Sequence, residues 1–371
     1  MKLLLLSRSL EVGGAERQLT TLAKALPAAG HQPLVAVFYP GGALEDELKE
    51  AGVPLVSLDK AGRWDLWGFG RRLGRLIREE QPDAIYSFLV EPNLAAAVAG
   101  RRHPGLRVAW GVRVSHLLPA NYDAFSRFTL RISARLAPWA HVIIANSRAG
   151  LEHHLRLGYP AARLVVIENG IDTGRFVFDP AGRRRMREKW GVAPDRPLVG
   201  LVGRLDPVKD HATFMEAAAL VSRRHPEAVF VAVGGGPAAY RGELEGKARG
   251  LGLEGRMIWA GQERDMPAVY SALDLHCSAS AAEGLPNAVA EAMSAGVPSV
   301  VTDVGDSRVL VGDTGAVVPP GDPAALAGAL NALGERLMLE KTALRQAARA
   351  RIVENYSLGR MVERTVAAIQ G

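Results

Sequence analysis

Two glutamates eight positions apart frame the segment whose residue types are best suited to chemistry. Residues 283–298 read EGLPNAVAEAMSAGVP, in which a stiff Gly-Leu-Pro turn separates Glu283 from a helix predicted over 287–295. Glu291 lies about one turn inside that helix, and Gly296 is expected to end it as a C-terminal glycine. We therefore expect one carboxylate just before the helix start and a second one just after it.

The start of this predicted helix is itself a binding element. The backbone N–H groups of Leu285, Asn287 and Ala288 would point out of the helix start and favour an anion. A carboxylate, an anion-binding nest and a second carboxylate then follow one another in order. A nucleotide sugar presents sugar hydroxyls, a diphosphate and a ribose diol, which match that order. The alternative is a pair of solvated surface glutamates.

A pair of cations follows the strand predicted over 196–203. Arg204 and Lys209 come at the carboxyl end of that strand, and Asp210 is expected to cap the next helix. An arginine can clamp two phosphate oxygens and a lysine acts as a point charge, so both suit a diphosphate. Charge builds on a diphosphate as it leaves, and these cations would then act as the electrophilic catalyst. The alternative is a surface ion pair with Asp206 or Asp210.

Glycine turns follow two other predicted strands. Gly13 and Gly14 come after the apolar run 2–7 and open a helix, where the backbone can approach a phosphate or sugar closely. A glycine run, 234–236, ends the strand predicted over 228–236. Tight turns between strands and helices need glycine anyway, so a simple turn is the alternative at both places.

These residues need a scaffold of parallel strands to bring them together. Strand patterns alternate with helical patterns along the chain, which predicts two doubly wound α/β domains with parallel sheets. The predicted strands are 2–7, 33–39, 53–58, 83–89, 107–112, 141–147 and 164–169, and then 196–203, 228–236, 256–261, 274–280, 297–303 and 315–320. Ligands bind beyond the carboxyl ends of such strands, so a site for two ligands is expected in a cleft between the domains.

Composition agrees with two domains and excludes several classes of protein. The chain has 371 residues, enough for about two domains, and 48% of them are hydrophobic, which argues against long disorder. Cys277 is the single cysteine, so an intramolecular disulfide and a cysteine zinc cluster are excluded. The four leucines after Lys2 are too few for a signal peptide or a membrane-spanning helix, which predicts a cytoplasmic protein.

The segments described so far resemble retaining glycosyltransferase family 4, whose fold is GT-B. The second domain of that family carries a Glu-Gly-x-Pro…Glu-Ala-Met-x-x-Gly-x-Pro run, which is similar to residues 283–298. The residues Gly203-Arg204-Leu205 with Lys209, Asn169-Gly170-Ile171-Asp172 and Gly13-Gly14-Ala15-Glu16 add to the resemblance. It covers most of the chain and is weakest in the middle of the first domain.

The resemblance implies two Rossmann-like domains that face each other across a cleft. It makes residues 1–180 the acceptor-binding domain and residues 181–355 the nucleotide-sugar domain. The seam near 170–195 has turn residues and no periodic pattern. A C-terminal helix over 356–371 is expected to pack back on the N-terminal domain.

The resemblance also assigns roles residue by residue. Glu283 would bind the donor sugar's hydroxyls near C3, Glu291 would accept hydrogen bonds from both ribose hydroxyls, and Gln262 would frame the nucleobase. The expected catalytic residues are Arg204, Lys209, Glu283 and His116. The expected donor-binding residues are Gly13, Gly14, Gly203, Gln262, Gly284, Leu285, Pro286, Asn287 and Glu291.

His116 and Arg113 compete for one position after the strand predicted over 107–112. Many family members place a histidine hereabouts, facing the donor sugar, but the residues around His116 depart from the commonest form of that motif. A surface histidine is the alternative. The sequence contains no Asp-x-Asp motif and no spaced cluster of histidines and carboxylates, so we expect no metal and no cofactor. The expected co-substrate is a nucleoside-diphosphate sugar, in the first place a UDP-sugar.

The net charge of +6 is unevenly distributed. Residues 1–180 hold 22 basic and 17 acidic residues, and residues 100–163 hold ten arginines with two acids. The large share of arginine over lysine can reflect GC-rich coding, but coding would not produce this clustering. A basic face on one domain indicates an anionic partner for that domain.

Two segments of the first domain combine basic and apolar residues. The helix predicted over 124–136 carries arginines at positions i, i+4 and i+8, and residues 63–78 combine arginines with tryptophan and phenylalanine. Such segments suit an anionic membrane surface, with a solvated helix as the alternative. No nucleic-acid module accompanies the charge, so a nucleic-acid partner is not expected. The acceptor-side and membrane-side candidates are Glu16, Arg113, Arg127, Arg131 and Arg135.

The resemblance and these features together predict a glycosyltransferase of the hexosyltransferase type that needs no metal. Retention of the anomeric configuration is implied by the resemblance alone. The acceptor would be a glycan or a lipid-linked hydroxyl in bacterial polysaccharide or glycolipid synthesis for the cell envelope. The chain would act in the cytoplasm, as a peripheral protein on the inner membrane face. Two alternatives stay open: a nucleotide-sugar epimerase of GT-B architecture, and a non-catalytic subunit that binds a nucleotide sugar.

Overall fold

The chain forms two compact units. The first unit comprises Met1–Gly170 together with Leu358–Gly371, and the second unit comprises Ile171–Ser357. The computed structural model describes residues 1–11, 13–113 and 124–371, with the backbone alone for 124–128. Within those residues, no helix is both long and apolar enough to cross a membrane.

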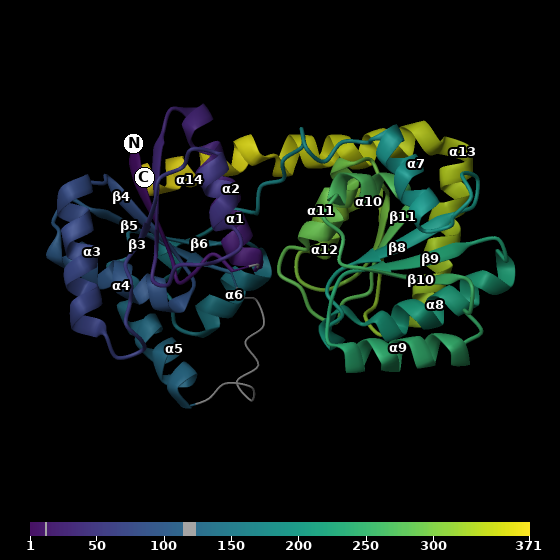
Figure 1. The fold of residues 1–371 in the computed structure, drawn as a ribbon, viewed down its shortest axis with the longest axis horizontal. Coiled ribbons are helices and arrows are strands. Elements are labelled where there is room, and N and C mark those ends of the chain that lie inside the picture. Colours follow the sequence, from purple (N-terminus) through teal and green to yellow (C-terminus); the bar gives the residue numbers. More distant parts are fainter. Residues whose placement is uncertain (12, 114–123) are drawn as a thin grey trace. The chain divides into compact units, whose positions relative to one another are not determined.

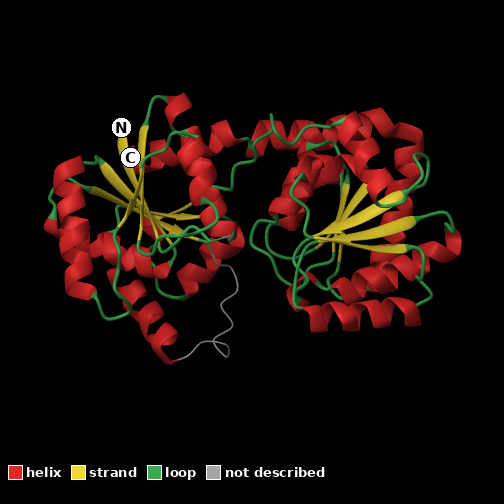
Figure 2. Ribbon diagram, in the orientation of Figure 1, coloured by secondary structure: helices red, strands yellow, loops and turns green. Residues whose placement is uncertain are grey.

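The first unit is built on one parallel sheet (Figures 1 and 2). In the described part of this unit the strand order is β3-β2-β1-β4-β5-β6-β7. The four leucines of β1 are fully buried, because helices cover both faces of a parallel sheet. The strands are β1 (Lys2–Ser7), β2 (Gln32–Val37), β3 (Leu55–Ser57), β4 (Ala84–Phe88), β5 (Arg107–Val112), β6 (Val142–Ala145) and β7 (Leu164–Val166).

Helices form a layer on each face of the first sheet. One core contains side chains of α1, α2 and α14, and the other contains side chains of α3, α4, α5 and α6. The C-terminal helix α14 therefore packs on the first unit, where Met361, Val362 and Ile369 are buried. The helices are α1 (Gly14–Ala25), α2 (Glu45–Glu50), α3 (Leu66–Glu80), α4 (Val90–Arg102), α5 (Ala124–Leu136), α6 (Arg148–Arg156) and α14 (Leu358–Gln370).

The second unit repeats this architecture with its own parallel sheet (Figure 2). The described strands run in the order β10-β9-β8-β11-β12-β13. They are β8 (Leu198–Val202), β9 (Val229–Val233), β10 (Met257–Gly261), β11 (Leu275–Ser278), β12 (Ser299–Thr302) and β13 (Ala316–Val318). The fold class predicted from the alternation of strands and helices, two doubly wound parallel sheets, is confirmed.

The helices of the second unit also lie on both faces of their sheet. α8, α9 and the first half of α13 share one core, while α7, α10, α11, α12 and the second half of α13 share the other. α13 is kinked at Glu340, whose φ and ψ are −127° and 33°. The helices are α7 (Pro180–Lys189), α8 (His211–Arg224), α9 (Ala238–Gly250), α10 (Met266–Ala272), α11 (Asn287–Ser294), α12 (Ser307–Val311) and α13 (Pro323–Tyr356).

The seam expected near 170–195, whose sequence has no periodic pattern, contains a helix. Helix α7 lies inside this range; the Asp179 side chain caps it by accepting from the backbone N–H of Ala181. Its buried positions include Arg187, so apolar periodicity could not reveal the helix. The first unit gives way to the second at Gly170–Ile171, earlier in the chain than the boundary expected near 180.

Arg187 is buried because Asp274 holds it in an ion-pair network. Its side chain is 3% exposed, and its Nη2 donates to Asp274 at 2.7 Å. The other oxygen of Asp274 accepts from Arg183 at 2.8 Å, and the backbone N–H of Leu198 donates to the same carboxylate at 3.0 Å. One carboxylate thus ties α7 to the strands β8 and β11.

We predict that Asp274→Ala destabilises the second unit strongly. The substitution leaves two guanidinium groups without their carboxylate, and removing one partner of a buried pair costs about 3–5 kcal/mol. Urea unfolding followed by circular dichroism should show a clearly lowered midpoint. Asp303→Ala is the control, because its pair with Arg308 is at the surface. Equal, small shifts in both variants would show that the buried network does not stabilise the unit.

Candidate active site

Apart from Gly13 and Gly14, which lie in the first unit, the residues expected to bind a nucleotide sugar belong to the second unit, and several of them gather at one edge of its sheet. Parallel neighbours β10, β9, β8 and β11 end at the same edge, so the loops after them emerge side by side. Gln262 follows β10, residues 234–236 follow β9, residues 203–209 follow β8 and residues 280–283 follow β11. The sheet topology therefore brings together segments that lie far apart in the sequence.

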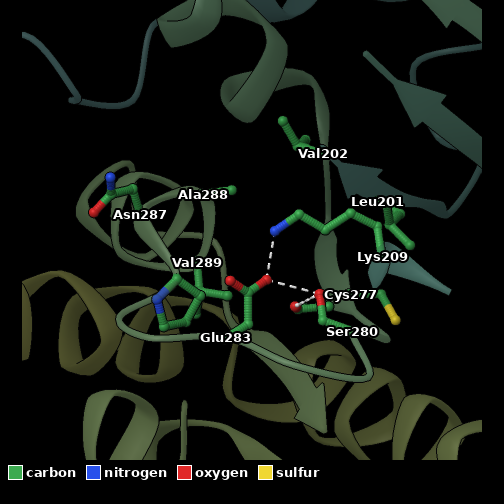
Figure 3. A pocket seen from close by; sticks show the side chains of 11 residues that line it. Leu201, Val202, Lys209, Cys277, Ser280, Glu283, Asn287, Ala288 and Val289 are labelled. Carbon is green, nitrogen blue, oxygen red and sulfur yellow. Dashed lines mark hydrogen bonds and ion pairs between the residues drawn. The ribbon is translucent and has the colours of Figure 1, made fainter. Parts of the chain in front are cut away.

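Glu283 and Lys209 form an ion pair at this edge (Figure 3). Lys209 Nζ lies 2.5 Å from Glu283 Oε1, and Ser280 Oγ donates to the same oxygen at 2.7 Å. The side chains are largely shielded, with exposures of 24% for Lys209 and 12% for Glu283. Among the described residues, none donates a hydrogen bond to Oε2 of Glu283. One carboxylate oxygen is thus held by the protein, and the other is available to a ligand.

The backbone fixes Lys209 in this position. The next residue, Asp210, has a left-handed conformation with φ of 46°, and its side chain caps α8 by accepting from the N–H of Thr213 at 3.0 Å. The N–H of Ala281 donates to the carbonyl of Val208 at 2.8 Å, which joins the loop after β11 to the turn that carries the lysine. The cap expected at Asp210 is present, and it helps to fix the orientation of the Lys209 side chain.

A small pocket opens between this ion pair and the start of α11 (Figure 3). Its lining includes Lys209, Ser280, Glu283, Asn287 and Ala288. α11 begins at Asn287, so its first turn lies at the pocket, where a helix start favours an anion. The pocket therefore combines a lysine, a helix start and a carboxylate, which are suited to a phosphate and a hydroxyl side by side.

The turn before α11 is held from behind. The carbonyl of Gly284 accepts from the N–H of Asp306 at 2.8 Å, and a Cβ at Gly305 would collide with the carbonyls of Glu283 and Gly284. The side chain of Leu285 is buried in the core, and Pro286 immediately precedes the helix. These residues shape the turn: Leu285 anchors it in the core, and Pro286 lines the pocket.

Glu291 has a different environment from Glu283. The hydroxyl of Tyr270 donates to Glu291 Oε2 at 2.7 Å. Tyr270 is buried, and burial together with the Glu291 charge raises its pKa well above the usual range. The phenol therefore stays protonated and acts as a permanent donor that orients the glutamate.

Two buried histidines lie near Lys209. Burial, followed by the charge of Lys209, lowers the pKa of His211 to about 4 and that of His276 to about 3. Both are therefore neutral near pH 7 and add no charge to the pocket. Neither nitrogen of His211 has a hydrogen-bond partner among the described residues.

Arg204 and Gln262 are exposed at the same edge. Arg204 is 79% exposed and lies 3.4 Å from a carboxylate oxygen of Asp206, which is the surface ion pair considered as the alternative to phosphate binding. Gln262 lies beside Gly235. Gly203 is packed so closely against Gly234, whose φ is 153°, that a Cβ at position 234 would collide with the Gly203 carbonyl.

The glycine turn of the first unit places an acid at a helix start. Gly13 precedes α1 and Gly14 is its first residue. The Glu16 carboxylate folds back toward Gly13, where a Cβ would collide with it. A carboxylate is favourable at a helix N-terminus, so Glu16 stabilises this turn itself.

Arg113 is held inside the first unit at the carboxyl end of β5. Its guanidinium donates to Asn169 Oδ1 and, at 3.0 Å, to the hydroxyl of Tyr86, and it lies over the ring of Phe88. Asn169 and Tyr86 are buried. These contacts fix the guanidinium at the edge of the sheet and link β4, β5 and the segment after β7.

Other predicted residues fall outside the described part or on the surface. His116 lies outside the described residues, and so does the side chain of Arg127. Arg131 and Arg135 are exposed on α5. Across the described side chains, no group of three or more histidines, cysteines and carboxylates is arranged to hold a metal ion.

Comparison with known proteins identifies the family. A family model described as "Glycosyltransferase Family 4" matches residues 12–175, and one described as "Glycosyl transferases group 1" matches residues 196–336. A GDP-mannose-dependent alpha-(1-6)-phosphatidylinositol monomannoside mannosyltransferase of Mycolicibacterium smegmatis is 30% identical over 71% of this chain and 70% of the relative. The chain belongs to glycosyltransferase family 4. A putative glycosyltransferase of Bacillus subtilis, EpsF, is 32% identical over 70% of this chain and 68% of its own length.

A solved structure agrees with this family membership. The Anabaena protein HepE in complex with UDP is 26% identical, with a TM-score of 0.86 over the full length of both chains. The GT-B fold implied by the sequence resemblance is therefore confirmed for this family 4 chain. The roles of the individual site residues stay predictions.

Sequence reasoning did not single out Ser280 and Tyr270 in this family 4 chain. Each donates to one of the two predicted ligand-binding glutamates, Ser280 to Glu283 and Tyr270 to Glu291. Ser280 comes three residues before its glutamate, a spacing visible in the sequence. Tyr270 is 21 residues from its partner, and only the packing of α10 against α11 brings them together.

We predict that Ser280→Ala lowers kcat/KM for the donor about tenfold. The change removes a hydrogen bond to a charged group, and such a bond contributes about 1.5–3 kcal/mol. Lys209 still holds Glu283, so the loss should be partial. Steady-state kinetics would measure it, with Ser299→Ala as a control, since that buried serine bonds elsewhere. Unchanged kinetics in Ser280→Ala would show that this bond does not position Glu283.

We also predict that stability falls as the pH is lowered from 7 to 5. Burial lowers the pKa of His154, His211 and His276 to between about 3 and 4, from 6.5 in the unfolded chain. The unfolded chain therefore binds more protons below pH 6.5. The free energy of unfolding should decrease by at most about 1.4 kcal/mol per pH unit for each histidine.

Urea midpoints measured between pH 7.5 and 5 would check this slope. His276→Gln should reduce the slope, because it removes one of the three histidines with the largest shifts. His103 and His141, whose pKa burial also lowers, still contribute to the slope. A slope that is the same in this variant would show that His276 is not protonated on unfolding. The slope, rather than the midpoint, is compared, so a general loss of stability does not affect the result.

Proposed function

We propose that this family 4 chain transfers a hexose from a UDP-sugar to an acceptor hydroxyl, with retention of the anomeric configuration and without a metal ion. The observation that carries the proposal is the pocket where Lys209, the start of α11 and Glu283 meet. A diphosphate beside Lys209 would lie next to the carboxylate that accepts sugar hydroxyls. The UDP complex of the similar HepE supports uracil as the base of the donor nucleotide.

The expected chemistry places each charge where it is needed. The acceptor oxygen would form a bond to C1 while the bond from C1 to the phosphate oxygen breaks on the same face. The acceptor's proton would pass to the leaving phosphate. Lys209, Arg204 and the helix start would stabilise the charge that develops on the diphosphate, which is the contribution a metal ion makes elsewhere. Glu283 and Glu291 would hold the sugar and the ribose.

The ligand-binding glutamates are prepared for this task. Ser280 and Lys209 saturate one oxygen of Glu283, so the orientation of the other is set before a ligand arrives. The hydroxyl of Tyr270 donates to one oxygen of Glu291 and so helps to orient that carboxylate. Preorganised groups lose little conformational freedom on binding, which favours specific recognition of a sugar and a ribose.

We further infer that the acceptor is a glycan or a lipid-linked hydroxyl. Support comes from relatives whose names specify a phosphatidylinositol mannoside acceptor and a role in lipopolysaccharide core biosynthesis. We propose that the chain acts in the cytoplasm, at the inner membrane face. Gly13, Gly14 and Gly203 would bound the donor site, and Glu16 and Arg113 would bound the acceptor site. Arg127, Arg131 and Arg135 belong to the proposed membrane-side set.

We predict that Lys209→Ala lowers kcat for donor hydrolysis and transfer about a hundredfold or more. The variant loses a charge aimed at the leaving group, and removal of one such group typically costs about 10²–10³ in rate. Product release from UDP-glucose, UDP-galactose and GDP-mannose would be measured by chromatography. Lys247→Ala is the control, because that lysine lies on α9 and pairs with Glu216.

Four further results would decide the details. Proton NMR of the first product formed should show the donor's own anomeric configuration, and an inverted product would contradict retention. Excess EDTA should leave the rate unchanged. Tight donor binding without hydrolysis or transfer for any acceptor would favour a binding subunit, and release of an epimerised sugar would favour an epimerase.

A further inference from the structure

An apolar tip projects from the first unit just before α3. Trp64 is 79% exposed, Leu66 is 67% exposed and Trp67 is 75% exposed. Burying an aromatic side chain is strongly favourable, so three large apolar side chains within four residues are costly to leave in water. Such a group marks a contact surface.

The loop that carries this apolar tip is held rigidly. Asp65 accepts hydrogen bonds from the backbone of Ala61 at 3.0 Å and of Phe69 at 3.2 Å, and it pairs with Arg72. Arg72 also donates to the carbonyl of Leu58 at 2.6 Å. The two indoles are therefore exposed on a turn whose backbone is held by hydrogen bonds.

The carbonyls at the tip are engaged as well. Lys60 Nζ donates to the carbonyl of Arg63 at 3.0 Å, and the N–H of Leu66 donates to the carbonyl of Trp64 at 2.8 Å. Lys60 thus links the start of the loop to its tip through this hydrogen bond. The tip can therefore enter an apolar layer with part of its backbone already hydrogen-bonded.

An arginine stripe continues from the apolar tip along α3. Trp67, Arg71, Arg75 and Arg78 follow one another at helical spacing and share one face, and the three arginines are exposed. The opposite face of α3 is buried in the core of the first unit, with Phe69, Leu73, Leu76 and Ile77. The helix is thus fixed to the sheet. Its outer face carries Trp67 near the start of the helix and the three arginines after it.

The charges around the apolar tip are almost all of one sign. Residues 60–78 contain six basic residues and one acid, and that acid is Asp65, which Arg72 neutralises. Indoles prefer the boundary between water and lipid, and each arginine near an anionic lipid surface adds to the attraction. A protein partner would need a complementary acidic groove for the whole stripe, whereas an anionic bilayer offers a uniform negative plane.

We propose that the apolar tip (Trp64, Leu66 and Trp67) and the arginine stripe (Arg71, Arg75 and Arg78) dock the first unit on an anionic lipid membrane. The indoles insert at the level of the headgroups, and the guanidiniums bind lipid phosphates along the surface. This deepens the peripheral location proposed above by assigning it to a surface. Docking needs neither donor nor acceptor, so it stands or falls independently of the proposed glycosyl transfer.

The test is co-sedimentation of the full chain with vesicles. Vesicles of phosphatidylcholine alone are compared with vesicles of phosphatidylcholine and phosphatidylglycerol. The wild type should bind the anionic vesicles, and its tryptophan fluorescence should shift to shorter wavelength. Trp64→Ala/Trp67→Ala should weaken binding about tenfold or more, since the apolar anchor is lost.

The arginine stripe is tested separately. Replacing Arg71, Arg75 and Arg78 with glutamine should weaken binding to anionic vesicles by up to about a hundredfold, and should change binding to neutral vesicles little. Raising the salt concentration should also weaken binding of the wild type to anionic vesicles. Equal binding of the wild type to both kinds of vesicle would overturn the role of the stripe.

Matched control variants lie on the second unit. Met338→Ala/Leu339→Ala removes two apolar side chains that are 75% and 84% exposed on α13. Arg184→Gln/Arg223→Gln/Arg249→Gln removes three exposed arginines. Both controls should bind vesicles like the wild type. If they weaken binding as much as the first-unit variants do, the proposed surface is wrong.

Two other outcomes would also overturn the proposal. Negligible binding of the wild type to both kinds of vesicle would exclude a membrane as the partner. A dimer that dissociates in Trp64→Ala/Trp67→Ala, seen by analytical ultracentrifugation, would assign the apolar tip to contact between copies of this chain. Hydrolysis of the nucleotide sugar in solution should be unchanged in these variants, which separates a failure of docking from a failure of catalysis.

Discussion

The parallel arrangement of the strands is the constraint on which the rest of this structure depends. Each sheet is covered by helices on both faces, so the middle of a strand must be apolar, as the leucines of β1 show. The polar side chains proposed to do chemistry therefore lie in the loops at the strand ends and in the helix that follows one of them. Because parallel strands all end at the same edge, those loops meet, and the proposed donor pocket lies where those after β8 and β11 come together.

Within that pocket, a shared carboxylate oxygen connects two segments of chain. Glu283 Oε1 joins the loop after β11 to Lys209 in the turn after β8, and Ser280 adds a second donor from its own loop. The pair places opposite charges where a diphosphate and a sugar hydroxyl would lie side by side.

Local sequence patterns predicted most helices and strands. The features that they did not predict depend on contacts between residues far apart in the sequence. The runs 2–7 and 107–112 and the helix over 124–136 were predicted with the bounds observed, because apolar periodicity and turn residues are local signals. Helix α7 escaped because an arginine, stabilised by a carboxylate 87 residues away, occupies a core position. Tyr270 escaped for the same reason: its partner is set by packing between helices, which a single sequence does not contain.

The abundance of arginine has a cause beyond coding bias and anionic partners. Several arginines donate to backbone carbonyls: Arg183 to three in succession from Ser271, and Arg349 to those of Thr173, Phe176 and Ser294. A guanidinium has five donors in a fixed fork, so it can satisfy carbonyls at helix and strand ends that a lysine could not. Arginines of this kind say nothing about a partner. The arginines that support the proposed partner are those exposed along a helix whose other face is already buried. In α3 these arginines adjoin the exposed indole of Trp67.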